Sequence, residues 1–346
     1  MNKIFIFVFS YCFLSLLASA SDVITSKNLP SLIVPLAKSS LLLDITLVAQ
    51  KNLVAVGERG HILTSTDAIN WRQASVPIQS TLTSVYFNSE NVGWAVGHDA
   101  SIVKTNDGGK TWHIQQYLPE SQKPLLDVVF LDENHGVAIG AYGQFYRTVD
   151  GGKKWTFEFH QEFLLQDDID YLEELKSEDE EAYLDERGSI LPHFNRILKD
   201  GRTLYMVGEI GLIAKSNDFG KNWLMFDEIY SGSFLDVLRT HDGNLLVAGL
   251  RGNIFRSVNN GTSWQHVNTK TTALFNAIVL SNDERIFLLG NNGTLLQSND
   301  DGQNFFSRNQ ADGKALIAGV WFKNKIIAVS DVGIKSINVT TAGLFE

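Results

Sequence analysis

Short apolar runs recur along this chain, and each run is bounded by Gly, Asn or Asp. In one repeat the runs fall at Leu82–Phe87, Gly93–Val96, Ser101–Lys104 and Thr111–Gln115. Runs of this length and composition predict four strands that are joined by short turns. No repeat contains the sustained i, i+3, i+4, i+7 pattern that favours a helix. The apolar and polar pattern therefore predicts an all-β fold.

A landmark turn marks each repeat: an apolar run ends in Gly, and two variable residues and usually a second Gly follow. The landmark positions are Gly57, Gly97, Gly140, Gly208, Gly249, Gly290 and Ser330. The steps between them are 40, 43, 68, 41, 41 and 40 residues. A period near 40 residues with about four strands per unit is typical of a β-propeller blade. We therefore predict a seven-bladed β-propeller as a single domain over residues 21–346.

A second turn, which we call the box turn, follows each landmark turn and reads T-N-D-G-G-K-T-W at Thr105–Trp112. Gly tolerates positive φ, and Asp accepts hydrogen bonds from its own downstream backbone. A turn between the third and fourth strands lies on the opposite face from the landmark turns, so we predict a purely structural role. The box-turn residues are Asp107, Gly108, Gly109, Trp112, Asp150, Gly151, Gly152, Trp155, Asp218, Gly220, Trp223 and Trp264.

The variable residues of the landmark turns form a mixed polar set on one face of the predicted ring. Loops on a rigid scaffold commonly carry binding residues, so we predict a partner-binding face there. Its residues are Glu58, Arg59, His98, Asp99, Tyr142, Glu209, Arg251, Asn291, Asn292 and Asp331. Ordinary turn composition is the alternative interpretation of each.

The net charge of −10 is concentrated in one segment. Residues 158–187 hold thirteen acidic residues and only Lys176 and Arg187 as basic ones, so this segment carries 2 − 13 = −11. The segment accounts for the 68-residue step, and Leu165, Ile169 and Leu172 fall on one helical stripe. We predict one acidic helical insertion, at about residues 159–190, between blades three and four.

Two interpretations of this insertion remain open. It is either a solvated surface helix or a docking element for a partner. Because the connection between blades lies on the landmark-turn face, we expect the insertion to overhang that face. The candidate docking residues are Asp167, Asp168, Asp170, Glu173, Glu174, Glu178, Asp179, Glu180 and Glu181.

The N-terminus has the features of an export signal. A basic start precedes the apolar stretch Ile4–Leu17 and the small residues Ala18-Ser19-Ala20, which predicts cleavage after Ala20 and a periplasmic or secreted protein. Cys12 is the single cysteine and lies in this signal, so we expect no disulfide in the mature chain. After cleavage we expect no membrane span.

The seventh unit contains three predicted strands instead of four. Ser31–Leu36 is an apolar run directly before the first blade. We predict that this N-terminal strand completes blade seven and closes the ring, because an open sheet edge invites aggregation.

The box turn matches the Asp-box, or BNR, repeat, and its pairing with V-G-x-x-G resembles the Ycf48/HCF136 group of photosystem II assembly and stability factors. The resemblance covers roughly residues 30–339. It implies a non-catalytic seven-bladed propeller that binds newly made membrane-protein partners on the lumenal side. The chain has no twin-arginine, plastid transit or lipobox signal, and the acidic insertion departs from the family pattern. In a non-photosynthetic organism the resemblance implies a role for another membrane complex.

The alternative function is an Asp-box glycosidase or sialidase-like hydrolase. Sialidase chemistry needs three arginines, and only Arg59 and Arg251 occupy suitable turns. Carboxylate pairs such as Glu58 with Glu209 would serve a simpler glycosidase. The histidines show no metal-binding spacing and the chain has no basic stripe, so we expect no metal, cofactor or nucleic-acid ligand, and a monomer.

Overall fold

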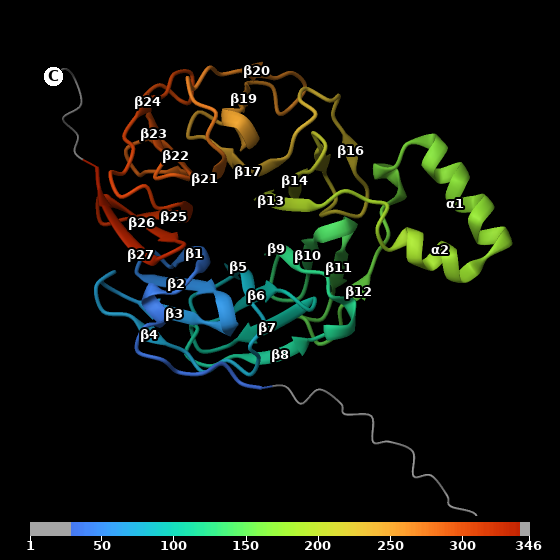
Figure 1. Ribbon diagram of the computed structural model, residues 1–346, viewed down its shortest axis with the longest axis horizontal. Helices are drawn as coiled ribbons and strands as arrows, with labels where there is room; N and C mark the ends of the chain where they lie inside the picture. The colour runs from blue at the N-terminus through green and yellow to red at the C-terminus, as the bar shows by residue number, and fades with distance from the viewer. Residues whose placement is uncertain (1–28, 340–346) are drawn as a thin grey trace, which may run out of the picture.

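A computed structural model describes residues 29–339 as a ring of seven β-sheets around a central axis (Figure 1). The strands of blades one and two are β1 (Leu42–Val48), β2 (Asn52–Gly57), β3 (Ile62–Ser65), β4 (Arg72–Gln73), β5 (Leu82–Phe87), β6 (Gly93–Gly97), β7 (Ser101–Thr105) and β8 (His113–Gln116). Those of blades three and four are β9 (Leu125–Phe130), β10 (Gly136–Gly140), β11 (Phe145–Thr148), β12 (Thr156–Phe157), β13 (Phe194–Asp200), β14 (Thr203–Gly208), β15 (Ile213–Ser216) and β16 (Leu224–Met225).

Blades five to seven complete the ring, which confirms the predicted seven-bladed β-propeller. Their strands are β17 (Phe234–Arg239), β18 (Leu245–Gly249), β19 (Ile254–Ser257), β20 (Gln265–His266), β21 (Phe275–Leu280), β22 (Ile286–Gly290), β23 (Leu295–Ser298), β24 (Phe306–Ser307), β25 (Leu316–Phe322), β26 (Lys325–Ser330) and β27 (Gly333–Asn338). Short 3-10 turns lie at η1 (Ala37–Ser39), η2 (Glu58–Gly60), η3 (Pro119–Ser121), η4 (Ala141–Gly143), η5 (Gln161–Phe163) and η6 (Leu250–Gly252).

Burial is highest in the second strand of each blade and lowest in the short fourth strands. The second strands, such as β10, are buried along their whole length because neighbouring blades cover both of their faces. The fourth strands, such as β12, have two residues and are exposed. Aromatic side chains fill the spaces between blades: Trp94 in blade two stacks on Phe130 in blade three with ring centroids 3.5 Å apart. The blades are therefore held together by apolar side chains between adjacent sheets.

The inner strand of every blade carries a bulge at the same place. In blade one the register shifts between Leu42 and Asp44, and the other six inner strands shift at the equivalent point. A bulge redirects the following side chain. The residue after the bulge, such as Asp44, lines the central cavity in blades one to five.

The N-terminal strand predicted to close the ring is not formed, and this prediction is wrong. Blade seven contains only β25, β26 and β27. The segment 29–36 runs along blade one instead, where Ser31 N–H donates to the Val76 carbonyl (2.9 Å) and Val34 N–H donates to Gln73 Oε1 (2.9 Å). Pro30 and Pro35 have no N–H to donate to a β-ladder, which explains why this stretch does not pair as a strand.

Ring closure instead uses the junction between η1 and the last landmark turn. A Cβ on Gly333 would lie 2.0 Å from the Lys38 carbonyl oxygen, so the two backbones are in direct contact. The same contact recurs around the ring, for example between Gly60 and the Ile78 carbonyl. Packing of β1 against β25 and β26 completes the closure.

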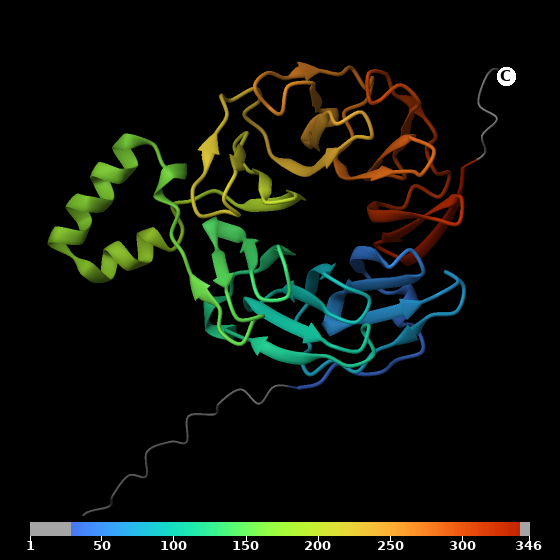
Figure 2. The ribbon, with the colours of Figure 1, turned by 180° about the vertical axis from the view of Figure 1, so that it is seen from behind.

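The insertion between β12 and β13 contains two helices rather than the one predicted, α1 (Gln166–Glu178) and α2 (Glu180–Arg187). The helical conformation is interrupted at Asp179, whose side chain caps α2 by accepting from Ala182 N–H (3.0 Å). Figures 1 and 2 show both helices outside the outline of the ring, beside β12 and β16. The insertion therefore stands at the rim and does not overhang the landmark-turn face as expected.

The apolar stripe of the insertion is only partly buried. Leu172 is buried against the propeller side, whereas Leu165 is 73% exposed. The firm attachment comes from Phe163, whose ring lies 5.0 Å from Phe194 and 5.9 Å from Trp223. Among residues 29–339, no helix is both long and apolar enough to cross a bilayer. The predicted signal, Cys12 included, lies outside the described residues.

Candidate functional site

Most of the box turns are organised by one carboxylate each. Asp107 Oδ1 accepts hydrogen bonds from the backbone N–H groups of Lys110 and Thr111, both at 3.0 Å, and from the Thr105 hydroxyl. Gly108 and Gly109 have φ of 76° and 88°, a region that favours glycine. Trp112 is buried and donates its Nε1–H to the Gly109 carbonyl at 3.1 Å. The Gly108 N–H also donates to the Asn91 carbonyl of the same blade (3.0 Å), and all of these contacts fit a structural role.

The landmark turns present two kinds of side chain on the opposite face. The first variable residue folds back onto its own blade in several turns. Glu58 accepts from Leu41 N–H (3.2 Å), and Glu209 accepts from His193 N–H (3.1 Å). Asn291 Oδ1 accepts from the Asn276 side chain at 3.0 Å. These side chains brace the entry to an inner strand.

The second variable residue points outward because its backbone is left-handed. The residues at this position with φ between 50° and 60° are Arg59, Asp99, Tyr142, Ile210, Arg251 and Asn292. Asp99 is held by the Ser80 hydroxyl, at 2.5 Å, and the other five are exposed. We call these five the outward set: Arg59, Tyr142, Ile210, Arg251 and Asn292. His98 and Asp331, at the first position, are also exposed.

Ile210 was not among the predicted face residues. Within the outward set, it is the residue type that is least compatible with a left-handed backbone. A β-branched residue is an outlier at positive φ, and Ile210 has φ 50° with 68% of its surface exposed. An isoleucine gains nothing for the fold at such a position. Its position in the landmark turn Y-M-V-G-E-I-G was the signal in the sequence, but the prediction selected the polar residues of these turns.

The end of the acidic insertion reaches the landmark-turn face. The Tyr142 ring packs edge-on against His193, with centroids 4.6 Å apart, and Lys123 Nζ lies 5.7 Å from the Tyr142 ring centroid. Lys123 also donates to the Gly188 carbonyl, directly after α2. The insertion is therefore connected to one edge of this face.

The predicted acidic docking residues are solvent-facing, with two internal contacts. Asp179 caps α2, and Asp170 accepts from the Gln166 amide (2.8 Å). The others make no side-chain hydrogen bond or ion pair to the described part of the chain: Asp167, Asp168, Glu173, Glu174, Glu178, Glu180 and Glu181. The insertion thus presents unpaired negative charge to solvent.

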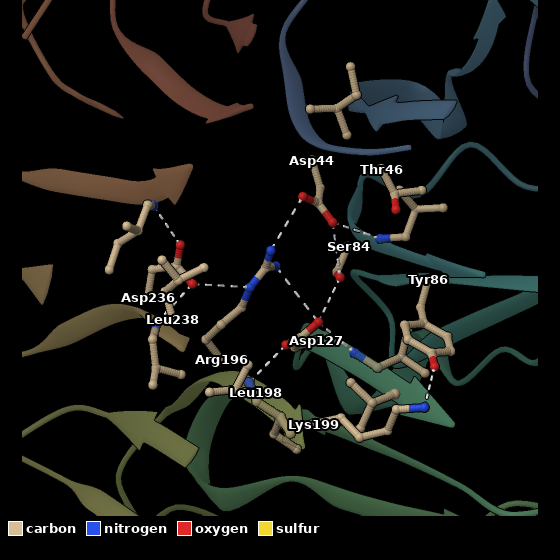
Figure 3. Close-up of a pocket in the computed structure, with 17 residues that line it drawn as sticks. Asp44, Thr46, Ser84, Tyr86, Asp127, Arg196, Leu198, Lys199, Asp236 and Leu238 are labelled. Atoms are coloured by element: carbon tan, nitrogen blue, oxygen red, sulfur yellow. Dashed lines mark hydrogen bonds and ion pairs between the residues drawn. The ribbon is translucent and has the colours of Figure 1, made fainter. Parts of the chain in front are cut away.

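The central channel holds a charged group that the sequence analysis missed (Figure 3). Arg196 on β13 lies between Asp44, Asp127 and Asp236, at 3.7, 3.7 and 3.6 Å. These residues line a cavity of about 320 Å³. All four follow the inner-strand bulge, so they repeat at the blade period. Aligning the repeats on their inner strands would have found them.

Each channel carboxylate also ties adjacent blades together. Asp44 accepts from Val85 N–H (2.9 Å), and Asp127 accepts from Ile197 N–H (2.8 Å). Asp236 accepts from Ile278 N–H (2.7 Å) in the same way. The three bonds join blades one to two, three to four and five to six.

Burial shifts the titration of this channel group. Burial raises the pKa of Asp236 to about 6, although Arg196 lowers it in part. Burial also raises the pKa of Asp44. Burial alone would lower the pKa of Arg196, but the three carboxylates raise it above its usual value. The channel therefore holds an internal ion-pair cluster, whose carboxylates also join adjacent blades through backbone hydrogen bonds.

Comparison with known proteins places this propeller. A family model described as "Photosynthesis system II assembly factor YCF48" matches residues 63–124. The photosystem II assembly protein Ycf48 of Thermosynechococcus vestitus is 28% identical over 232 residues, which are 67% of this chain and 60% of that protein. A solved structure titled "YCF48 bound to D1 peptide" has a TM-score of 0.66 at 19% identity, covering 90% of this chain and 100% of that one. The chain is similar in sequence to Ycf48 proteins over part of its length.

The similarity to Ycf48 proteins rests on the sequence matches, since the structural match shows the fold alone. The match spans 60% of the length of the Thermosynechococcus relative. Virginiamycin B lyase from Staphylococcus aureus, in a catalytically inactive form, has a similar TM-score of 0.67 at 10% identity, covering 88% of this chain and 96% of that one. The same fold therefore serves an enzyme elsewhere, and function has to be argued from the residues.

Proposed function

We propose that this chain is a non-catalytic assembly or stability factor that binds a membrane-protein partner outside the cytoplasm. In a photosynthetic organism the partner is photosystem II, and elsewhere it is another membrane complex. The observation that carries the proposal is the outward set on the landmark-turn face. Five side chains project from left-handed turns at one level of the ring, and the acidic insertion joins the same face at Tyr142.

The roles stated in the names of the similar proteins support this proposal. Ycf48 is a photosystem II assembly protein, and a Ycf48 structure holds a D1 peptide. The N-terminal signal predicted from the sequence supports export. In this chain, the outward set offers two guanidinium groups, an aromatic ring, an aliphatic side chain and an amide, which suits the mixed surface of a protein partner.

The acidic insertion adds long-range attraction for a basic partner surface. Residues 158–187 carry a net charge of −11, and most of these acids face solvent without a partner. Attraction of this kind raises the association rate and is screened by salt. We expect partner binding to weaken between low and physiological ionic strength.

The hydrolase alternative gains no support from the carboxylates that it would use. Glu58 and Glu209 are engaged by backbone N–H groups at 3.2 and 3.1 Å, and Asp99 is held by Ser80. A glycosidase needs one free carboxylic acid and a second free carboxylate on either side of the substrate. The landmark-turn face is better suited to binding than to hydrolysis.

The test is co-purification from solubilised membranes of the source organism, using the mature protein as bait. The face variant is Arg59→Asn with Arg251→Asn, because Asn292 already occupies the equivalent left-handed position. The matched control is Lys110→Asn with Lys153→Asn, which removes two exposed charges on the box-turn side.

We expect wild type and control to retain one membrane complex and the face variant to lose it, with unchanged melting temperatures. Equal recovery by both variants would contradict the assignment of the landmark-turn face. Hydrolysis of an oligosaccharide panel by the wild type would contradict the non-catalytic role.

A further inference from the structure

A cavity of about 410 Å³ lies within the acidic insertion, between its entry segment and the two helices. Its apolar wall consists of Leu164, Ile169 and Leu172, and the Phe159 and Tyr183 rings stand beside them. Leu164 and Leu172 are buried, so this wall is fixed by the packing that attaches the insertion. The cavity belongs neither to the landmark-turn face nor to the channel.

Both basic residues of the insertion line this cavity. The Arg187 guanidinium lies 4.6 Å from the Phe159 ring centroid and 6.0 Å from that of Tyr183. Lys176 Nζ lies 5.5 Å from the centroid of the same Tyr183 ring. Aromatic rings therefore hold both cations at the cavity, in the geometry of cation–π contacts.

Neither cation has an acidic partner, although thirteen acids lie in the same segment. Within residues 29–339, no carboxylate oxygen lies within 4.0 Å of the Arg187 or Lys176 nitrogens, and Arg187 makes no side-chain hydrogen bond. The Arg187 Nε is buried without an acceptor. The terminal guanidinium nitrogens of Arg187 also lack an acceptor and are not buried, so an anion bound in the cavity would accept from them.

We infer that this cavity binds a monocarboxylate with an apolar body. The carboxylate accepts from Arg187 and Lys176, and the body packs on Leu164 and Leu172. Glu173 at the rim and the acidic surroundings disfavour anions of higher charge, such as phosphates. Such a carboxylate comes either from a free small molecule or from a Glu side chain between apolar residues of a partner chain.

The experiment titrates the mature protein with two pairs of probes, by calorimetry at low salt. The first pair is 3-phenylpropionate and its neutral amide. The second pair is the capped peptides acetyl-Leu-Glu-Leu-amide and acetyl-Leu-Gln-Leu-amide. We expect at least one acid to bind and its neutral partner not to bind. Binding of the small acid alone assigns a free ligand, and binding of the peptide acid alone assigns a partner side chain.

The variants are Arg187→Gln and Lys176→Gln, with Lys153→Gln as the control for loss of one exposed charge elsewhere. We expect Arg187→Gln to raise the Kd about tenfold, because a guanidinium forms two charge-assisted bonds with a carboxylate. Lys176→Gln should raise the Kd by a smaller factor, and it keeps the inference testable if Arg187→Gln loosens the helices.

Three results would overturn the inference: no binding of either acid, equal binding of an acid and its neutral partner, or unchanged binding in both cavity variants. The proposed function fails on a different measurement, equal co-purification by the landmark-turn variant and its control. The two failures are therefore distinguishable.

Discussion

At the residue scale, a single carboxylate organises most of the box turns. Asp218 accepts from the backbone N–H groups of Lys221 (3.1 Å) and Asn222 (3.0 Å), and from the Asn222 amide (2.7 Å). In blade five Asn259 takes the same position and accepts from Ser263 N–H at 2.9 Å. The turn geometry therefore survives without the charge, and the charge adds strength to the hydrogen bonds.

This difference gives a prediction about acid stability. Burial alone would raise the pKa of Asp218, but hydrogen bonds from Asn222, Ser216 and Lys221 lower it from 3.8 to about 2. A carboxylate with a lowered pKa stabilises the fold above its unfolded value, and this contribution is lost as the pH falls from about 4 to about 2. The shift corresponds to ~2.5 kcal/mol before solvent screening, which we reduce to about 1 kcal/mol for this largely accessible group.

Asp218→Asn should therefore lower the free energy of unfolding by about 1 kcal/mol at pH 7. The deficit relative to wild type should shrink towards zero at pH 2, as measured by urea unfolding across this range. Asp242→Asn is the control, because Asp242 is exposed and its side chain makes no hydrogen bond within residues 29–339. A deficit that stays constant with pH would show that the charge of Asp218 has no part in the effect.

The box tryptophans carry the second residue-scale prediction. Trp112 is 3% exposed and packs edge-on against Phe87, with centroids 6.1 Å apart. Trp112→Ala should cost roughly 3–5 kcal/mol because it leaves a cavity between blades one and two. Lys110→Ala in the same turn should cost little. If the Trp112 variant kept the wild-type denaturation midpoint and lost its partner, the box turn would be a binding site instead.

At the scale of elements, the acidic insertion is two structures with different roles. Its entry, around Phe163, belongs to the hydrophobic core with Phe194 and Trp223. Its helices, α1 and α2, extend from the rim and contribute mainly Leu172 to that core. The sequence indicated helix through the spacing of Leu165, Ile169 and Leu172. It did not reveal that Phe163 is the anchor, because a single aromatic residue outside the helical stripe has no period.

The two parts should respond differently to removal. Phe163→Ala should cost roughly 3–5 kcal/mol, as a buried aromatic truncation. Replacing residues 166–187 by a Gly-Ser linker keeps Phe163 and Leu164, breaks no strand pairing and should cost less, since long loops add little closure entropy. Urea unfolding of both variants gives the comparison. A helix deletion that fails to fold, beside a stable Phe163 variant, would show that α1 and α2 are the structural part.

At the scale of the whole molecule, repetition determined what the sequence could reveal. The 40-residue period gave the blade number, and the strands of blade two begin and end within about two residues of the predicted ranges. The channel cluster was missed because Asp44, Asp127, Arg196 and Asp236 lie many residues apart and each resembles an ordinary strand residue. The N-terminal strand was wrongly predicted because its apolar residues, such as Ile33, are typical of a strand. The prolines in and beside this segment prevent the pairing that a strand needs.

Closure of the ring depends on a backbone contact rather than on an added strand, and this gives the last prediction. Gly333 has φ 96°, and a Cβ there would lie 2.0 Å from the Lys38 carbonyl and 2.6 Å from the Ser39 Cα. Gly333→Ala must therefore push η1 away from blade seven. Gly243 is the matched control, with φ 81° and nothing within 4 Å of its Cβ position, so Gly243→Ala introduces backbone strain alone.

We expect Gly243→Ala to cost about 1–2 kcal/mol, the usual penalty for a left-handed residue, and Gly333→Ala to cost roughly 3–5 kcal/mol. Removal of residues 21–36 should cost less than Gly333→Ala, because residues 29–36 only line blade one through bonds such as Ser31 to Val76. Thermal unfolding of the three variants decides between the two modes of closure. The opposite result would be a truncation that is the most destabilising change, with Gly333→Ala no worse than its control. The loss of stability would then depend on residues 29–36 and not on the junction at η1, so the N-terminal segment would close the ring.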